Sequence, residues 1–448
     1  MRDLFEHAAA AAFEPLAGDE LATLWLEAED SQFVRLNGAR IRQAGTVRRP
    51  VATLRLIRGA RQASDTLVLT GQPGQDDARL RASVASLRAA LDDASDDPHL
   101  LVARGAARTE ARAAGAAPDA FDLAQRVARL ARGQDLVGFV ASGPVARGFA
   151  SATAAGPEAR HWFDTASASL DFSIHRPGNR AVKVQLAGDA AAEQLADAAI
   201  DQALERAARL ARWLERPPVD IRPGQHRALL EPAATAEMLG MAEWSGFSLR
   251  AHRTRNSPLG RFHDGEVEFD GRVTLTEEAA ASGAPRFQSD GYVMPPRLAL
   301  IDAGRRAELL VSPRSEREFG VPSNGAPSSE SPTALRLAGA ELRDEDALRA
   351  LGTGLWIGNL WYLNWSDRAG ARVTGMTRFA TFWVENGQVV GPVAPLRFDD
   401  SVYRIFGSQV EALGVTPRWL PDTSTYDVRG TGSVAAPSLL LRSLSIVL

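Results

Sequence analysis

The chain has 448 residues, of which 45% are hydrophobic and 24% charged, and its formal net charge at pH 7 is −4. These values are typical of a globular protein of two or three domains, and the mildly acidic balance disfavours nucleic-acid binding. The absence of cysteine excludes disulfides, cysteine-ligated zinc, iron–sulfur clusters and thiol nucleophiles.

The N-terminal stretch MRDLFEHAAAAAFEPL is predicted to form an amphipathic helix, because its acidic residues and short alanine run do not suit a signal peptide. No run of apolar residues approaches the length of a membrane span. We therefore expect a cytoplasmic protein. Lys183 is the only lysine and lies in the strand-like AVKVQL, which excludes a phosphate-binding P-loop.

The next region is predicted to be a β-meander. Asn37-Gly38 favours a tight hairpin with positive φ at both turn positions, between strands at Phe33–Leu36 and Ala39–Arg42. A separate strand is expected at Val51–Arg58.

Helices and strands then alternate in blocks. Helices are predicted over Asp76–Leu91 and Asp119–Ala131, and strands return between Leu136 and Leu186. The apolar face of the second helix is predicted to consist of Leu123, Val127 and Leu130.

A long helix is predicted from Asp189, which can cap its N-terminus, to Arg216, where two prolines end it. The following PPVDIRPGQH has the composition of a linker, so we place a domain boundary between Pro217 and Gly224. The predicted domains are residues 1–218 and 219–448.

The second domain is predicted to begin with a helix over Pro232–Trp244 and to be mostly strands afterwards. Gly320–Pro332 is a long polar loop, and Asn386-Gly387 indicates a hairpin between Thr377–Glu385 and Gln388–Val393. The expected fold is α+β, with an N-terminal β-meander carrying long helices and a mostly antiparallel C-terminal β domain.

The stretch from Gly354 to Phe398 resembles the C-terminal domain of the TldD/PmbA family of peptidase-related proteins. The similarity lies in Trp361-Tyr362, the VTGMTR run, the VENGQVVGPV hairpin and the closing LRF. Phe33–Gln43 is similar to the family's early hairpin, and Leu136–Ala154 resembles the strand region before its long helix.

This resemblance implies a two-domain α+β fold and dimers with a cleft between subunits that accepts extended peptide. TldD-type members are zinc metallopeptidases with a His-Glu-x-x-x-His helix and a C-terminal cysteine ligand, and the glutamate acts as base on zinc-bound water. In this chain the matching helix has Ala236 and Met241 at the two histidine positions, although Glu237 and Gly240 remain. The cysteine position falls within 423–426, which holds no thiol.

The chain therefore resembles the metal-free PmbA (TldE) branch of the family. That branch implies a non-catalytic subunit without a cofactor of its own, which helps a TldD-type zinc subunit enclose an extended peptide. Two alternatives stay open, namely a homodimeric peptide-binding or scaffold protein and a metal-independent hydrolase. We expect neither nucleic acid nor a membrane as partner.

Glu237 is interpreted as a remnant of the motif glutamate, as a contact to bound peptide or as a solvated helix residue. Met241, in contrast, is expected to fill the core. His252 and His263 are eleven residues apart, which matches no compact metal-ligand spacing.

The peptide-binding candidates come from a loop that resembles a family loop near the cleft and from the aromatic strand region. Other interpretations are a mobile surface loop for the first group, and core or subunit interface for the aromatic residues. The segment from Trp361 to Trp365 is expected to alternate between two faces. The candidates are Asn324, Gly325, Trp361, Tyr362 and Arg378.

Overall fold

The structure is a computed structural model that describes residues 1–112, 117–178, 180–189 and 195–448. Its first half contains α1 (Arg2–Phe13), β1 (Leu21–Asn37), β2 (Arg40–Arg58), β3 (Arg61–Val68), α2 (Pro73–Asp93), β4 (Arg108–Arg112), α3 (Ala120–Leu130), β5 (Asp135–Thr153), β6 (Gly156–Arg176), β7 (Arg180–Asp189) and α4 (Asp197–Trp213).

The elements of the second half are shorter. They are β8 (Gly224–Leu230), α5 (Pro232–Glu243), α6 (Leu249–Arg253), α7 (Gly260–His263), β9 (Leu275–Glu277), α8 (Ala279–Ser282), β10 (Leu298–Asp302), β11 (Arg305–Arg306), α9 (Pro313–Phe319), β12 (Ala334–Leu337), η2 (Asp344–Asp346), α10 (Ala347–Leu351), β13 (Gly354–Asp367), β14 (Arg372–Glu385), β15 (Gln388–Pro392), β16 (Arg397–Ser401), η3 (Arg404–Ser408), β17 (Val410–Leu413), β18 (Arg418–Pro421), β19 (Ser433–Ala436) and β20 (Leu439–Ile446).

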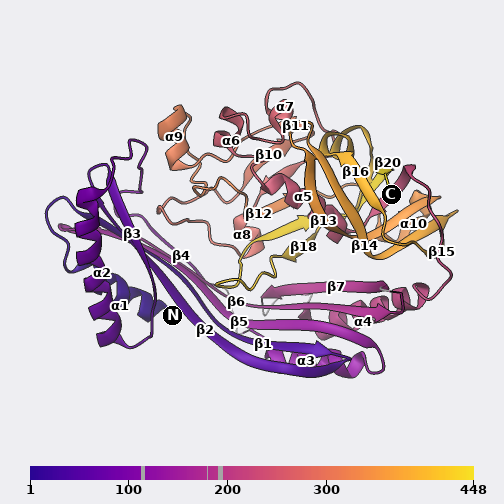
Figure 1. Cartoon of the computed structure of the whole chain (residues 1–448), viewed down its shortest axis with the longest axis horizontal. Helices are drawn as coiled ribbons and strands as arrows, with labels where there is room; N and C mark the ends of the chain where they lie inside the picture. Colours follow the sequence, from indigo (N-terminus) through magenta and orange to yellow (C-terminus); the bar gives the residue numbers. More distant parts are fainter. Residues whose placement is uncertain (113–116, 179, 190–194) are drawn as a thin grey trace.

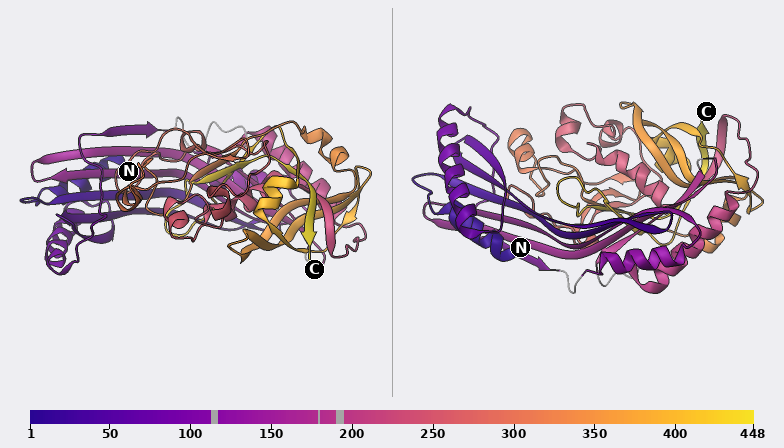
Figure 2. Two further views of the ribbon diagram at one scale, coloured as in Figure 1. Left: turned by 90° about the horizontal axis from the view of Figure 1, so that it is seen from above. Right: turned by 60° about the horizontal axis from the view of Figure 1, so that its bottom comes forward.

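The first half is built on one long, curved sheet. Its strand order is β3-β2-β1-β5-β6-β4, with β7 also paired to β6, and its four longest strands contain 17 to 21 residues. At about 3.3 Å per residue such strands extend roughly 55–70 Å. The second half of the chain lies along the concave side of this sheet (Figures 1 and 2).

The second half contains two further sheets. In one of them β13, β8, β20, β16 and β14 pair in sequence and β14 pairs again with β13, so the ring closes into a small barrel. The other has the order β11-β10-β9-β12-β19-β18 and ends at β18. The predicted α+β class, with an N-terminal antiparallel sheet and a β-rich C-terminal region, is confirmed.

Many of the predicted elements are present, but the early strands are longer than expected. Val51–Arg58 is not a separate strand, since β2 continues unbroken from Arg40 to Arg58 and pairs with β1 along its whole length. The β1–β2 turn is shifted by one residue, because positive φ occurs at Gly38 and Ala39 rather than at Asn37 and Gly38. The second hairpin, with positive φ at Asn386 and Gly387, is as predicted.

Helix α4 begins later than predicted. Asp189 is the last residue of β7, residues 190–194 lie outside the described residues, and α4 starts at Asp197. In α3, Leu123 and Val127 are buried but Leu130 is exposed, so the predicted apolar face is wrong at its last position.

The aromatic strand β13 does not alternate as expected. Trp361 and its neighbour Tyr362 are both exposed, by 53% and 79%. The cause is a bulge, because Tyr362 has a φ of +55° and the pairing of β13 with β14 shifts between Trp361 and Asn364.

The polar loop at 320–332 is held to the protein by a buried carboxylate. Glu330 is fully buried and accepts hydrogen bonds from Ser248 Oγ at 2.6 Å, from the backbone N–H of Arg250 at 2.8 Å, and from Ser312 N and Oγ at 2.9 Å. These four donors satisfy the hydrogen-bonding capacity of the buried carboxylate.

The two halves share one apolar cluster. Leu204 and Leu210 of α4 belong to the same buried cluster as Leu351, Trp356 and Phe382 from the second half. The domain boundary near 217–224 stays a prediction, and the core crosses it. Among the described helices, none combines the length and apolar character that crossing a membrane requires.

Candidate functional site

Helix α5 places Glu237 against strand β13. Glu237 Oε1 accepts a hydrogen bond from Asn359 Nδ2 at 3.1 Å, and its Oε2 accepts one from the backbone N–H of Leu360. Burial raises the pKa of Glu237 to about 7, against the opposing effects of these two hydrogen bonds and of the positive charge on Lys183. Glu237 is thus partly buried and hydrogen-bonded rather than freely solvated.

Glu237 lines a cavity of about 580 Å³ that lies between the two halves of the chain. Its wall combines α5, β7, the segment before β12 and both ends of the β18–β19 connection. The lining residues are Lys183, Gln185, Ala233, Ala236, Glu237, Glu243, Pro332, Thr333, Leu420, Pro421, Asp422, Thr423, Gly430, Thr431, Gly432, Ser433 and Val434.

A second carboxyl group of α5 also lines this cavity. Burial, together with the negative charges of Glu277 and Asp422, raises the pKa of Glu243 to about 7. Asp422 itself accepts a hydrogen bond at Oδ1 from the backbone N–H of Ser424 at 2.8 Å.

Among the described residues that line this cavity, Lys183 is the only cationic one. Its ammonium group lies 3.3 Å from Asp171 Oδ2, which also accepts a hydrogen bond from Gln185 Nε2 at 3.1 Å. Asp171 therefore balances much of the positive charge that Lys183 brings to the wall.

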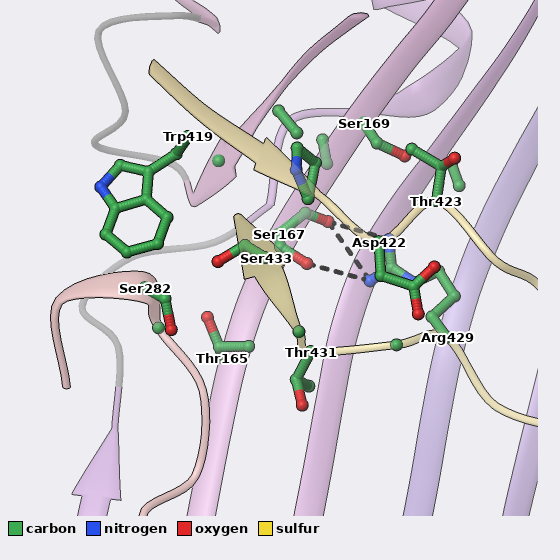
Figure 3. A pocket seen from close by; sticks show the side chains of 18 of the residues that line it. Thr165, Ser167, Ser169, Ser282, Trp419, Asp422, Thr423, Arg429, Thr431 and Ser433 are labelled. Atoms are coloured by element: carbon green, nitrogen blue, oxygen red, sulfur yellow. Dashed lines mark hydrogen bonds between the residues drawn. The ribbon is translucent and has the colours of Figure 1, made fainter. Parts of the chain in front are cut away.

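A neighbouring cavity of about 410 Å³ shares the β18–β19 connection with the first (Figure 3). Hydroxyl side chains from both halves line it, and Arg429 forms part of its wall. Arg429 is only 7% exposed and donates hydrogen bonds to the carbonyls of Gly143 at 2.6 Å and Ser167 at 3.2 Å. The hydroxyl-bearing lining residues are Thr165, Ser167, Ser169, Ser282, Thr423, Ser424, Thr425, Thr431 and Ser433.

A third cavity, of about 560 Å³, continues along the same strands toward α4 and β13. All three cavities are lined both by β7 and by the segment 416–425 that contains β18. We call the three together the β7–β18 groove.

Both strands that border this groove are edge strands. Within the parts of the chain that the structure describes, β7 pairs only with β6 and β18 only with β19. An edge strand with unpaired N–H and C=O groups is a template for pairing with another extended chain. The groove can therefore hold an extended peptide by β-strand addition.

The positions at which the family resemblance implies zinc ligands do not lie together in one site. Ala236 and Thr423 line the 580 Å³ cavity, whereas Met241 is buried in the core of the second half and Tyr426 is almost fully exposed. Across the described ranges, no three His, Cys, Asp or Glu side chains are arranged to hold a metal ion. The donor set does not fit a zinc ion held by imidazole and thiolate.

The peptide-binding candidates from the sequence are not among the residues that line the three cavities. Asn324 accepts a hydrogen bond from the N–H of Val311 and donates one to the carbonyl of Leu309, and Gly325 follows it at a φ of +78°. Their role in binding peptide stays a prediction.

The aromatic candidates lie together on the β13–β14 hairpin. The guanidinium of Arg378 lies over the ring of Trp361, 5.8 Å from its centroid, and Tyr362 is the most exposed residue of the group. Their roles also stay predictions.

The structure brings together two histidines that lie eleven residues apart in the sequence. The rings of His252 and His263 lie 5.4 Å apart, and His252 Nε2 is 3.6 Å from Asp264 Oδ1. His263 Nε2 is hydrogen-bonded to the carbonyl of Gly246 at 2.6 Å. This contact gives His263 a structural role in the packing of the second half.

Sequence reasoning missed Glu243, Asp422, Gln185 and Arg429 because they come from segments far apart in the chain. One signal was available for Lys183, which is the only lysine. Its position in a strand was clear from the sequence, but its place opposite α5 was not.

Comparisons with known proteins agree with this architecture. The family profile described as PmbA/TldA metallopeptidase C-terminal domain matches residues 223–447. No sequence among curated proteins matches the chain.

Three solved structures share the fold across almost the entire chain. TldE from Thermococcus kodakarensis is 13% identical with a TM-score of 0.73, and the match covers 100% of both chains. A protein from Thermotoga maritima, described as a proposed modulator of a DNA gyrase, is 13% identical with a TM-score of 0.72 and the same coverage. A similarly described protein from Bacteroides thetaiotaomicron is 17% identical with a TM-score of 0.69, over 99% of this chain and 98% of that one.

At these identities the structural likeness establishes the fold, and the profile match over half of the sequence establishes the relationship. The chain belongs to the PmbA/TldD family.

Proposed function

We propose that this chain is a metal-free subunit of a TldD/TldE-type peptidase complex, in which it binds extended peptide and a TldD-type partner supplies zinc. The observation that carries the proposal is the β7–β18 groove, where two unpaired strand edges border cavities that reach α5. The likeness to TldE supports the metal-free assignment.

In the proposed mechanism, the peptide backbone pairs with β7 or β18 and so becomes extended. Hydroxyl groups such as those of Ser167, Ser169 and Thr431 can donate to its carbonyls or accept from its N–H groups. The chain's own residues thus bind and orient the peptide, and the order they impose lowers the entropic cost of presenting it to a partner.

The assignment of zinc to a partner rests on donor chemistry. Alanine and methionine occupy the two histidine positions of the family's zinc helix, and the segment 423–426 offers hydroxyl groups in place of a thiolate. Glu237 remains, but a carboxylate without metal-bound water to deprotonate has no substrate for that role.

The proposal is tested by purifying the chain alone and together with a TldD-type subunit from the same source. We expect no stoichiometric zinc and no cleavage of unstructured peptides by the chain alone. The co-expressed pair should form a stable complex with one zinc site and peptidase activity. Stoichiometric zinc with robust cleavage by the isolated chain would contradict the proposal, and an obligate homodimer that ignores the TldD-type subunit would favour the scaffold alternative.

The groove itself is tested by filling it. Gln185 lines two of the three cavities, so Gln185→Trp should weaken the binding of an unstructured peptide at least tenfold while the thermal midpoint stays within a few degrees. Gln43→Trp, at an exposed position of β2 outside the groove, is the matched control and should bind peptide normally. Equal binding by both variants would place the peptide elsewhere.

A further inference from the structure

We propose that the β7–β18 groove selects peptides that carry a basic side chain, arginine or lysine, and that Glu243 is the residue that determines this specificity. This inference rests on the proposed function, because it names the chemistry of one position within the same groove. It adds the class of peptide that the groove prefers.

The first argument is the balance of charge around the 580 Å³ cavity. Three carboxyl groups, those of Glu237, Glu243 and Asp422, line it together with the single ammonium group of Lys183. Since Asp171 lies 3.3 Å from that ammonium group, its positive charge is already matched from outside the cavity. The wall is therefore left with an excess of negative charge, which favours a cationic ligand.

The second argument is the state of Glu243. Among the described residues, no donor forms a hydrogen bond or ion pair with its carboxylate, although it is partly buried at the cavity wall. Other buried carboxylates of the second half accept several hydrogen bonds each. Glu277, 2% exposed, accepts from Thr333 N at 3.0 Å, Thr333 Oγ1 at 2.7 Å and Ala334 N at 3.0 Å.

This contrast matters because a partly buried carboxylate without a partner is unfavourable in its charged form. A guanidinium or ammonium group that enters the cavity would supply this carboxylate with hydrogen-bond donors and with an opposite charge. Glu330, which is saturated by Ser and backbone donors, shows how the same fold satisfies a carboxylate that has only a structural role.

The third argument is that the cavity is accessible from a bound peptide. Gln185 and Lys183 of β7 and Leu420 of β18 belong both to the edge strands and to the cavity wall. Side chains of a strand that is added to either edge alternate between its two faces, so one set can point toward α5. A long, flexible basic side chain reaches such a wall while its backbone stays paired at the edge.

The inference is tested with three fluorescent ten-residue peptides that differ at one central position, which is arginine, its neutral isostere citrulline, or glutamate. Binding to the full chain is measured by fluorescence anisotropy at low salt and pH 8. We expect the arginine peptide to bind at least tenfold more tightly than the citrulline peptide, and the glutamate peptide to bind most weakly. The preference for arginine should shrink as the salt concentration rises.

Glu243→Gln tests the assigned residue. It should reduce the preference for arginine over citrulline to less than threefold, while binding of the citrulline peptide stays unchanged and so reports that the variant is folded. Glu205→Gln, at an exposed position of α4 away from the cavities, is the matched control and should keep the full preference.

The outcomes separate the inference from the function on which it rests. Equal binding of the arginine and citrulline peptides overturns the inference and leaves a peptide-binding groove in place. Absence of binding by every peptide overturns both. A preference for arginine that survives in Glu243→Gln overturns the assignment to Glu243.

Discussion

Two carboxyl groups of one helix, Glu237 and Glu243, are placed where burial makes their charged forms unfavourable. For both groups the pKa rises from 4.5 to about 7. They differ in what surrounds them, because Glu237 accepts two hydrogen bonds from β13 while Glu243 faces the negative charges of Glu277 and Asp422. Glu243 is therefore the simpler of the two to test by substitution.

Glu243→Gln should stabilise the protein at pH 8. An acid whose pKa is raised by folding favours the folded state most below its unfolded pKa, and this contribution is lost as the pH rises from about 4.5 through about 7. At roughly 1.4 kcal/mol per pKa unit, reduced for partial exposure, the variant should gain about 2 kcal/mol in its free energy of unfolding at pH 8. At pH 4.5 it should gain little.

Urea titrations of both proteins at the two pH values provide the measurement. Glu205→Gln, exposed on α4, serves as control and should leave the stability at both pH values within about 0.5 kcal/mol of the wild type. A stability gain that is equal at pH 4.5 and pH 8 would contradict the assigned pKa shift.

At the scale of elements, the β1–β2 hairpin carries a residue that its backbone does not suit. Ala39 has a φ of +54°, a left-handed conformation that costs an L-residue about 1 kcal/mol or more, whereas glycine adopts it freely. Ala39→Gly should therefore raise the free energy of unfolding by about 0.5 kcal/mol, after the greater entropy of the unfolded glycine is subtracted.

The control is Ala44→Gly, at an exposed position within β2, where the backbone is extended and glycine should cost about 0.5–1 kcal/mol. Opposite signs for the two substitutions, measured by chemical denaturation, support the shifted turn. A loss of stability in Ala39→Gly would mean that the buried methyl group of Ala39 contributes more to stability than its left-handed backbone costs.

The connection between β18 and β19 is fastened to the first sheet by a buried arginine. Pairing of β1 with β5 stops after Glu29–Val145 and resumes at Gln32–Ser142, and the free carbonyl of Gly143 in this gap accepts from Arg429. A Cβ at Gly143 would lie 2.2 Å from the carbonyl oxygen of Asp30, so the gap itself requires glycine. The arginine fills a break in the sheet.

Arg429→Ala should lower the free energy of unfolding by about 2–3 kcal/mol, because it leaves the carbonyls of Gly143 and Ser167 without their donor. In this variant, amide hydrogen exchange should also increase over the wild-type rate more in residues 422–432 than in the rest of the chain. Arg442→Ala, which removes contacts to the carbonyls of Ser408 and Val410 far from the groove, is the control for exchange in that segment. Unchanged exchange at 422–432 in Arg429→Ala would contradict a fastening role.

The elements show what local patterns can and cannot predict. The Asn386-Gly387 hairpin and α5 follow from short-range turn and periodicity signals, and both are present as predicted. The continuity of β2 was missed because the stretch near Arg48-Arg49 is polar, yet the neighbouring strands β1 and β3 hold it in the sheet. The start of α4 was misplaced because Asp189 suits a helix cap, whereas pairing with Ser167 keeps it in β7.

The groove lies beyond this kind of prediction for a physical reason. Lys183 is separated from Glu243 and Asp422 by at least 60 residues in sequence, and it meets them only because the second half docks on the concave side of the first sheet. Family resemblance located Glu237 and the lost ligand positions, but it did not indicate the acidic excess around them.

At the scale of the whole molecule, the apolar cluster between α4 and the second half decides how the chain unfolds. The ring centroids of Trp213 and Trp356 lie 6.2 Å apart, and those of Trp213 and Phe382 lie 6.0 Å apart, so aromatic packing crosses the proposed boundary near residue 218. Separating the halves would expose these rings to water, at about 25 cal/mol for each Å² of apolar surface.

We therefore predict that the intact chain unfolds in a single cooperative transition and that neither 1–218 nor 219–448 does so alone. Calorimetry should give one peak for the intact protein. Trp356→Ala should shift this whole peak to lower temperature without splitting it, and it should lower the free energy of unfolding by about 3–5 kcal/mol. Each isolated half should bind a hydrophobic dye through the exposed α4 face or the exposed Trp356 and Phe382. Two resolved transitions, or a half that melts cooperatively by itself, would mean that the boundary separates independent domains and that the groove between them can open without unfolding either.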